Sequence, residues 1–128
     1  MVKYLRAKKI YDRSLPPGHP NRALPRVNLG NVYLSAGDYE KALEEYESAL
    51  KIQEASLPGD HPDIARTLHN LAVVQAHRGM IDQAREYLER AEETAGRTLS
   101  TKHPVMTLLT KTKDFMVEEV KDYVFTRH

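Results

Sequence analysis

A 42-residue internal repeat is the feature that most restricts what this chain can fold into. The dipeptide His-Pro occurs three times at that interval, at residues 19–20, 61–62 and 103–104. Residues 61–102 also match residues 19–60 at 12 of 42 positions. A fixed period of this length predicts a solenoid built from stacked copies of one small unit.

The first residues of the chain continue the same phase as half a unit. Residues 1–18 overlay residues 43–60, and Tyr4 falls at the position of Tyr46. This half unit corresponds to the second helix of a repeat and lacks the first. We therefore expect either a fragment of a longer array or an apolar stripe buried by a partner or a second copy, because a repeat cannot bury its own apolar face alone.

The segment Asn28–Leu50 is the clearest unit and predicts a helical hairpin. Apolar and small residues recur every three or four positions on both sides of a Gly-Asp pair. Gly30 and Ala42 leave room for two helices to approach closely, and the ring of Tyr46 fills the space beside them. Gly37 can adopt the left-handed conformation that ends a helix.

The spacing of the small and apolar residues in this hairpin resembles the tetratricopeptide repeat. The residues that carry the resemblance are Leu29, Gly30, Tyr33, Gly37, Ala42, Tyr46 and Ala49. The 42-residue period, with His-Pro at the start of each unit, resembles the subtype found in kinesin light chains. The resemblance implies an all-α fold, a right-handed superhelical solenoid of antiparallel helix pairs.

The period divides the chain into four parts of a single domain. We expect a half repeat with helix B only over 1–18, full repeats over 19–60 and 61–102, and a capping helix over 103–128. Pro25 lies where the second repeat has Thr67, so the first helix of the first repeat is expected to start late or to kink.

Composition excludes several classes of protein. The chain has 128 residues, no cysteine, and 19 basic against 18 acidic residues. We expect a cytoplasmic protein, because no signal peptide or apolar stretch long enough to span a bilayer is evident. The near-zero net charge disfavours nucleic acid as a partner. The basic segment over residues 5–9 is expected to be a solvated helix face rather than a targeting signal.

No constellation of residues predicts catalysis. The sequence has no Gly-rich phosphate loop, no nucleophile elbow and no HExxH motif. The repeated histidines His19, His61 and His103 are a full repeat apart, so we expect helix caps and no metal site. The chain is therefore expected to be neither an enzyme nor a cofactor-binding protein.

The resemblance implies a peptide-binding groove along the concave face, formed by the first helix of each repeat. The implied groove residues are Leu24, Val27, Asn28, Asn31, Arg66, His69, Asn70, Val73, His77, Leu108, Lys111 and Phe115. In this family, an asparagine at the positions of Asn28 and Asn70 holds the ligand backbone; the alternative is that these residues brace adjacent helices.

The expected groove mixes cations with apolar contacts. Arg66, His69 and Lys111 would supply the positive charge, which suits a partly acidic peptide with hydrophobic anchors. A clamp for a C-terminal carboxylate is not expected, because Val27 and Leu108 occupy positions where that clamp needs cations.

Two functions follow from these features. The first is a protein-interaction adaptor or scaffold that binds an extended peptide in the groove. The second is a structural or assembly module that acts through the terminal helices, by self-association into a homo-oligomer or by docking. RNA binding is disfavoured because no basic stripe is present.

Overall fold

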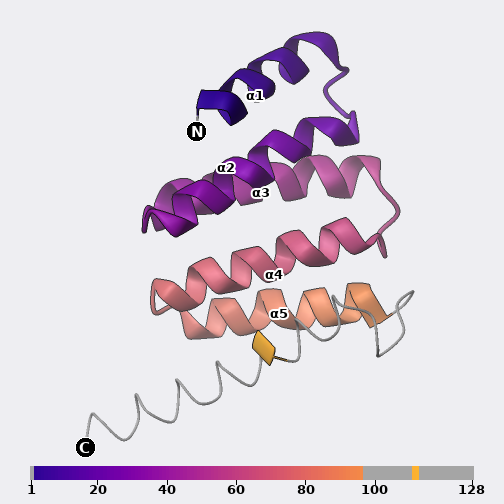
Figure 1. Ribbon diagram of the computed structural model, residues 1–128. Helices are drawn as coiled ribbons and strands as arrows, with labels where there is room; N and C mark the ends of the chain where they lie inside the picture. The colour runs from indigo at the N-terminus through magenta and orange to yellow at the C-terminus, as the bar shows by residue number, and fades with distance from the viewer. Residues whose placement is uncertain (1, 97–110, 113–128) are drawn as a thin grey trace, which may run out of the picture.

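The computed structural model describes residues 2–96 and 111–112, and all regular structure in this part of the chain is helical. The helices stack one after another from the N-terminal end of the chain (Figure 1). Their bounds are α1 (Val2–Ser14), the 3-10 turn η1 (Pro20–Arg22), α2 (Ala23–Ser35), α3 (Tyr39–Ser56), α4 (Pro62–His77) and α5 (Ile81–Gly96). The predicted solenoid of antiparallel helix pairs is confirmed.

The first two His-Pro pairs each cap a helix at the start of a unit, and the third, at residues 103–104, lies outside the described residues. The Asp63 backbone N–H donates to Nδ1 of His61 at 3.0 Å, and the Asn21 N–H donates to Nδ1 of His19 at 3.1 Å. The following proline occupies the first turn, where a helix leaves its N–H groups without partners. Both histidines therefore act as N-caps, as the sequence predicted.

Helix α2 begins later than α4. Its repeat opens with η1, and the α-helix starts only at Ala23, which leaves it with 13 residues against 16 in α4. Pro25 then lies in the first turn of α2, where its missing N–H breaks no intrahelical bond. The predicted late start is confirmed.

Glycine makes both turns between paired helices. Gly37 and Gly79 have φ values of 78° and 79°, in the left-handed region that favours glycine. The carboxylate of Asp38 then caps α3 by accepting the Lys41 N–H at 3.4 Å. These short turns reverse the chain, so α3 returns along α2 and α5 returns along α4.

The core lies between the helix pairs. Tyr46 and Leu50 of α3 pack in one buried cluster with Leu68 and Leu71 of α4 and Leu88 of α5. A side chain at Gly30 of α2 would overlap the ring of Tyr46, so the close approach of α2 and α3 requires glycine there.

A buried arginine joins the first three helices. Arg26 donates to both carboxylate oxygens of Asp12, at 2.9 and 2.8 Å, and to Ser48 Oγ at 3.1 Å. Asp12 belongs to α1 and Ser48 to α3, so Arg26 fixes α1 onto the α2–α3 pair.

The described part of the chain contains no helix that is long and apolar enough to cross a membrane.

Candidate functional site

An open pocket of about 470 Å³ lies between the starts of α2 and α4 and the end of α3. Three elements meet there because α3 ends where α4 begins and lies beside α2. The residues that line the pocket are Pro20, Asn21, Ala23, Leu24, Val27, Gln53, Leu57, Asp63, Arg66 and Thr67.

Apolar side chains form one wall of this pocket. Leu24 is 56% exposed although it is a large aliphatic residue, and Val27 one turn later is half-buried. Leu57, which follows the last residue of α3, completes the wall. An exposed leucine beside further apolar side chains offers a contact surface for an apolar group of a ligand.

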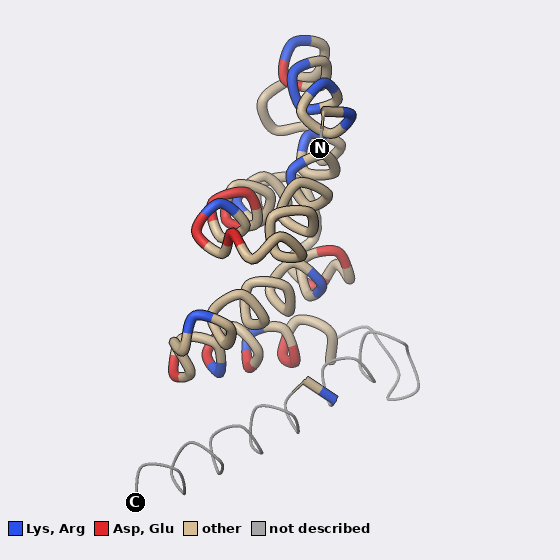
Figure 2. Tube along the Cα trace, turned by 60° about the vertical axis from the view of Figure 1, so that its left-hand side comes forward, with Lys and Arg blue, Asp and Glu red and all other residues tan. Residues whose placement is uncertain are grey.

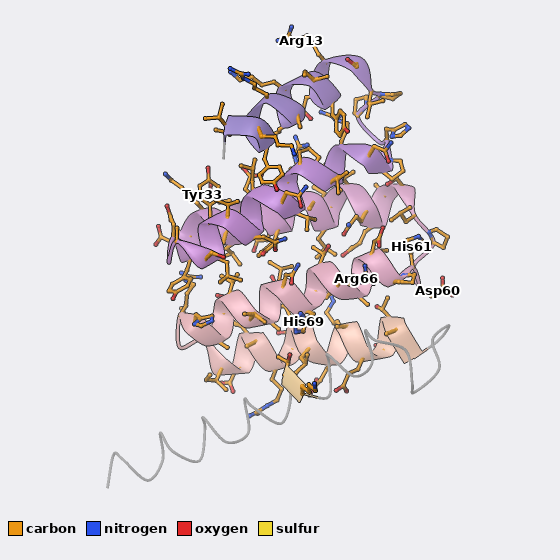
Figure 3. All side chains as sticks on the ribbon, viewed as in Figure 1. Arg13, Tyr33, Asp60, His61, Arg66 and His69 are labelled. Atoms are coloured by element: carbon orange, nitrogen blue, oxygen red, sulfur yellow. The ribbon has the colours of Figure 1, made fainter. Side chains whose placement is uncertain are left out.

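Polar groups also line the pocket. Arg66 and Asp63 are exposed on the first turns of α4, and Figure 3 labels Arg66 there. Gln53 of α3 is only 6% exposed, and within the described residues its Oε1 atom is buried without a hydrogen-bond partner. An oxygen this deeply buried has no surface that a ligand in the pocket could reach, so Gln53 shapes the pocket without offering it an acceptor.

The structure brings three of the predicted groove residues together in the pocket, namely Leu24, Val27 and Arg66. Sequence reasoning missed Gln53, Leu57 and the other lining residues. Leu57 carried a signal, because Leu99 repeats it one period later. Gln53 carried none, since the second repeat has Ala95 at that position.

His69 differs from the expected groove cation. It is 7% exposed, and its Nε2 lies 2.7 Å from Thr112 Oγ1. Burial lowers the pKa of His69 below its ordinary value of 6.5, so the ring is neutral near pH 7. The residue therefore connects α4 to the segment at residues 111–112 and supplies no positive charge to the groove.

The predicted asparagines have different surroundings. The Tyr46 hydroxyl donates a hydrogen bond to Oδ1 of Asn31, so the acceptor of Asn31 is used inside the fold. Burial raises the pKa of Tyr46 to about 12, which keeps that hydroxyl protonated. Asn28 and Asn70 are half-buried, one on each of the two helices that flank the pocket.

Three further predicted residues that the structure describes, Val73, His77 and Lys111, do not line the pocket. Val73 is half-buried on α4, and His77 at the end of that helix stacks on Tyr39, with ring centroids 5.3 Å apart. Lys111 is exposed. Leu108 and Phe115 lie outside the described residues.

A second recess, of about 310 Å³, lies between α3, α4 and α5 and has a different chemistry. Its lining residues are all polar or charged: Glu47, Gln75, Gln83, Glu86, Tyr87 and Arg90. Gln75 donates to Gln83 Oε1 at 2.8 Å and accepts from Arg78 at 2.9 Å. Because its glutamines already bond one another and Arg78, this recess is a weaker candidate for ligand binding than the pocket beside Leu24.

Comparisons with known proteins agree with this architecture. The tetratricopeptide repeat family profile matches residues 3–55 and 21–97. No curated protein matches the chain significantly.

A solved structure with the same arrangement of helices is a crystal structure of nearly identical TPR-like repeats, described as kinesin light chain repeats of Podosopora anserina. The TM-score is 0.74 and the sequence identity 26%; the match covers 83% of this chain and 50% of that structure. This chain thus spans half the length of the solved protein.

Proposed function

Because the chain belongs to the tetratricopeptide repeat family, in its kinesin light chain type, we propose that it holds an extended peptide of a partner protein in the groove between α2 and α4. Repeats of this family are generally non-catalytic interaction modules, which makes protein partners the general expectation. The peptide, its position and its chemistry are our proposal.

The observation that carries the proposal is the pocket between the two helices. Its volume of about 470 Å³ lies within the range of pockets that bind small ligands and side chains. Leu24 remains exposed beside this pocket. An apolar side chain of the peptide would cover Leu24 and Val27.

The charges at the pocket suggest which residues flank the apolar anchor. Arg66 is exposed on the α4 side, and it forms no ion pair within the part of the chain that the structure describes. A carboxylate next to the anchor would pair with this guanidinium. Asp63 lies one turn earlier on α4 and would disfavour a second carboxylate at that end. The proposed ligand therefore carries one acidic residue beside one hydrophobic residue.

Asn28 and Asn70 are proposed to hold the backbone of the peptide. They are repeat-equivalent residues on α2 and α4, and each side-chain amide can donate and accept one backbone hydrogen bond. Asn31 is less suited to this role, because its oxygen already accepts from Tyr46.

The test is selection of binding peptides from a random library displayed on phage, followed by affinity measurement with variants. Leu24→Asp should reduce affinity for the selected peptides at least tenfold, and Asn28→Ala with Asn70→Ala should do the same. Arg66→Glu should shift the preference from acidic to basic peptides. Arg85→Glu, an exposed change on α5, is the matched control and should leave binding unchanged.

Folding of each variant is checked by circular dichroism. Selected peptides that bind all folded variants equally would place the interaction outside this groove and contradict the proposal.

A further inference from the structure

The two helices that flank the groove, α2 and α4, carry very little charge. Leaving histidine aside, their charged residues are Arg26, Asp63 and Arg66. Helices α3 and α5 have five acidic and two basic residues each. Figure 2 shows this contrast, with charged positions frequent on α3 and α5 and sparse on α2 and α4. Because Arg26 is buried against Asp12, the exposed charges of these two described helices are Asp63 and Arg66.

Both exposed charges line the pocket beside Leu24. They are three residues apart, so their Cα atoms differ in height by about 4.5 Å along the axis of α4. Opposite charges at this spacing can pair on the surface of a helix. In the described part of the chain, however, Asp63 and Arg66 form no ion pair with each other. Each charge is therefore open to a ligand in the pocket.

The nearby His61 does not neutralise Asp63. Its Nδ1 lies 3.8 Å from Oδ2 of Asp63, but the same nitrogen accepts the Asp63 backbone N–H at 3.0 Å. A ring nitrogen that accepts a hydrogen bond carries no proton, so it cannot act as a cation toward the carboxylate. Figure 3 shows His61 at the start of α4 and Arg66 further along the helix. Within residues 2–96 and 111–112, the Asp63 carboxylate thus lacks a cationic partner.

An extended peptide can meet this arrangement with three successive residues. Its neighbouring side chains point to opposite sides, and residues i and i+2 lie about 6.6 Å apart on the same side. This spacing exceeds the rise from Asp63 to Arg66 by only about 2 Å, which the long arginine side chain can cover. The residue between them faces the other way, toward the apolar wall formed by Leu24 and Val27.

We propose that the groove selects a peptide in which one apolar residue has a basic neighbour on one side and an acidic neighbour on the other. This inference rests on the proposed function and names the class of peptide that the same site takes. The basic residue pairs with Asp63, the acidic residue pairs with Arg66, and the apolar residue packs on Leu24.

Two acidic neighbours would place one carboxylate beside Asp63, where like charges repel. The order of the two charges also matters. Reversing it requires the peptide to run in the opposite direction, which is not equivalent for the backbone bonds to Asn28 and Asn70.

The test is an NMR titration of the isotope-labelled chain with four acetylated and amidated peptides of the form Ser-Gly-X-Leu-Z-Gly-Ser. X and Z are Lys and Asp, Asp and Lys, Asp and Asp, or Lys and Lys. One of the two mixed peptides should bind about tenfold more tightly than the other three. The variant with both Asp63→Arg and Arg66→Asp should prefer the reverse mixed order by a similar factor.

The matched control is the variant with both Asp82→Arg and Arg85→Asp. These residues are also three apart and exposed near the start of a helix, but they do not line the pocket. Their exchange should leave the preferred order unchanged. The exchange on α4 keeps the helix cap, because His61 accepts a main-chain N–H. Circular dichroism verifies that both variants fold.

Leu24→Asp separates this inference from the proposed function. If it does not weaken binding, or if no peptide binds, both the groove and its charge selection are overturned. If it weakens binding but the peptide with two Asp residues binds as tightly as the better mixed peptide, only the charge selection is overturned. The same holds if the exchange of Asp63 and Arg66 leaves the preferred order unchanged. Inversion by this exchange, and not by the control, supports the proposal.

Discussion

Nη2 of Arg26 lies 2.9 and 2.8 Å from the two carboxylate oxygens of Asp12, so a single guanidinium nitrogen holds both oxygens. The arginine side chain is 8% exposed and the aspartate side chain 32% exposed. Arg22 also donates to Asp12 at 3.0 Å. Helix α1 therefore attaches to the α2–α3 pair through a charged contact rather than through apolar packing alone.

Replacing this aspartate should loosen α1. We expect Asp12→Asn to lower the free energy of unfolding by roughly 1–2 kcal/mol, because Arg26 keeps its other bonds but loses its charge partner. Urea denaturation followed by circular dichroism measures the change. The control is Glu54→Gln, which removes the exposed 3.2 Å ion pair with Arg90 and should cost less than about 1 kcal/mol. Equal costs for both variants would contradict a special role for Asp12.

The contribution of Asp12 should depend on pH. Its hydrogen bond with Arg26 holds the pKa of the carboxyl below the ordinary value of 3.8. Because the pKa is lower in the folded chain, the stabilisation is present above 3.8 and is lost as the pH falls through the lowered value. The stability difference between the parent and Asp12→Asn should thus be constant from pH 7 to 5 and shrink below pH 4. A difference that persists at the lowest pH would show that it is not electrostatic.

The close approach of α2 and α3 predicts a specific compensation. Gly30→Ala should lower stability by roughly 1–3 kcal/mol, because the new methyl group overlaps the buried ring of Tyr46. The second repeat has Ala72 and Leu88 at these two positions. Combining Gly30→Ala with Tyr46→Leu should therefore cost less than the sum of the single changes, and a double-mutant cycle measures the coupling.

Gly96→Ala is the control for this cycle, since a methyl group there meets no described atom within 4 Å other than the backbone of its own helix. Alanine favours helix over glycine by up to about 1 kcal/mol, so this change should be neutral or stabilising. Strict additivity of the Gly30 and Tyr46 changes would contradict the proposed contact.

The histidine cap of α4 gives a fourth prediction. His61→Ala should cost about 1 kcal/mol, because the Asp63 N–H loses its acceptor. His61→Asn should restore most of this loss, since asparagine is among the best N-cap residues. Thermal unfolding of the two variants measures the difference. An asparagine variant as unstable as the alanine variant would show that the histidine acts through another contact.

Much of this fold could be predicted from the sequence because the repeat places equivalent residues in equivalent roles. His19 and His61, the glycines of both turns and the Gly30–Tyr46 contact all follow from positions that recur or are replaced conservatively. These are local signals, carried by residues within a single hairpin.

Contacts between units were harder to predict. Asp12 and Arg26 have Glu54 and Leu68 as their repeat equivalents, so the pair occurs once and leaves no periodic trace. Gln53 reaches the pocket only because the end of α3 lies beside both α2 and α4. His69 likewise contacts Thr112, which lies 43 residues later in the chain. Where three elements meet, spacing along one helix does not determine which side chains face the opening.

The second hairpin has Ala72 and Leu88 where the first has Gly30 and Tyr46, and this paired replacement also bears on how such an array can grow or be re-engineered. The first helix is smaller in α2, with Gly30, and its partner α3 carries the larger Tyr46; α4 has Ala72, and its partner α5 carries Leu88. Helix α2 therefore does not fit α5, and α4 does not fit α3. Duplication, deletion or shuffling can therefore preserve the core only when whole hairpins move together. For this chain, the unit of exchange is the matched pair of helices, not the single helix.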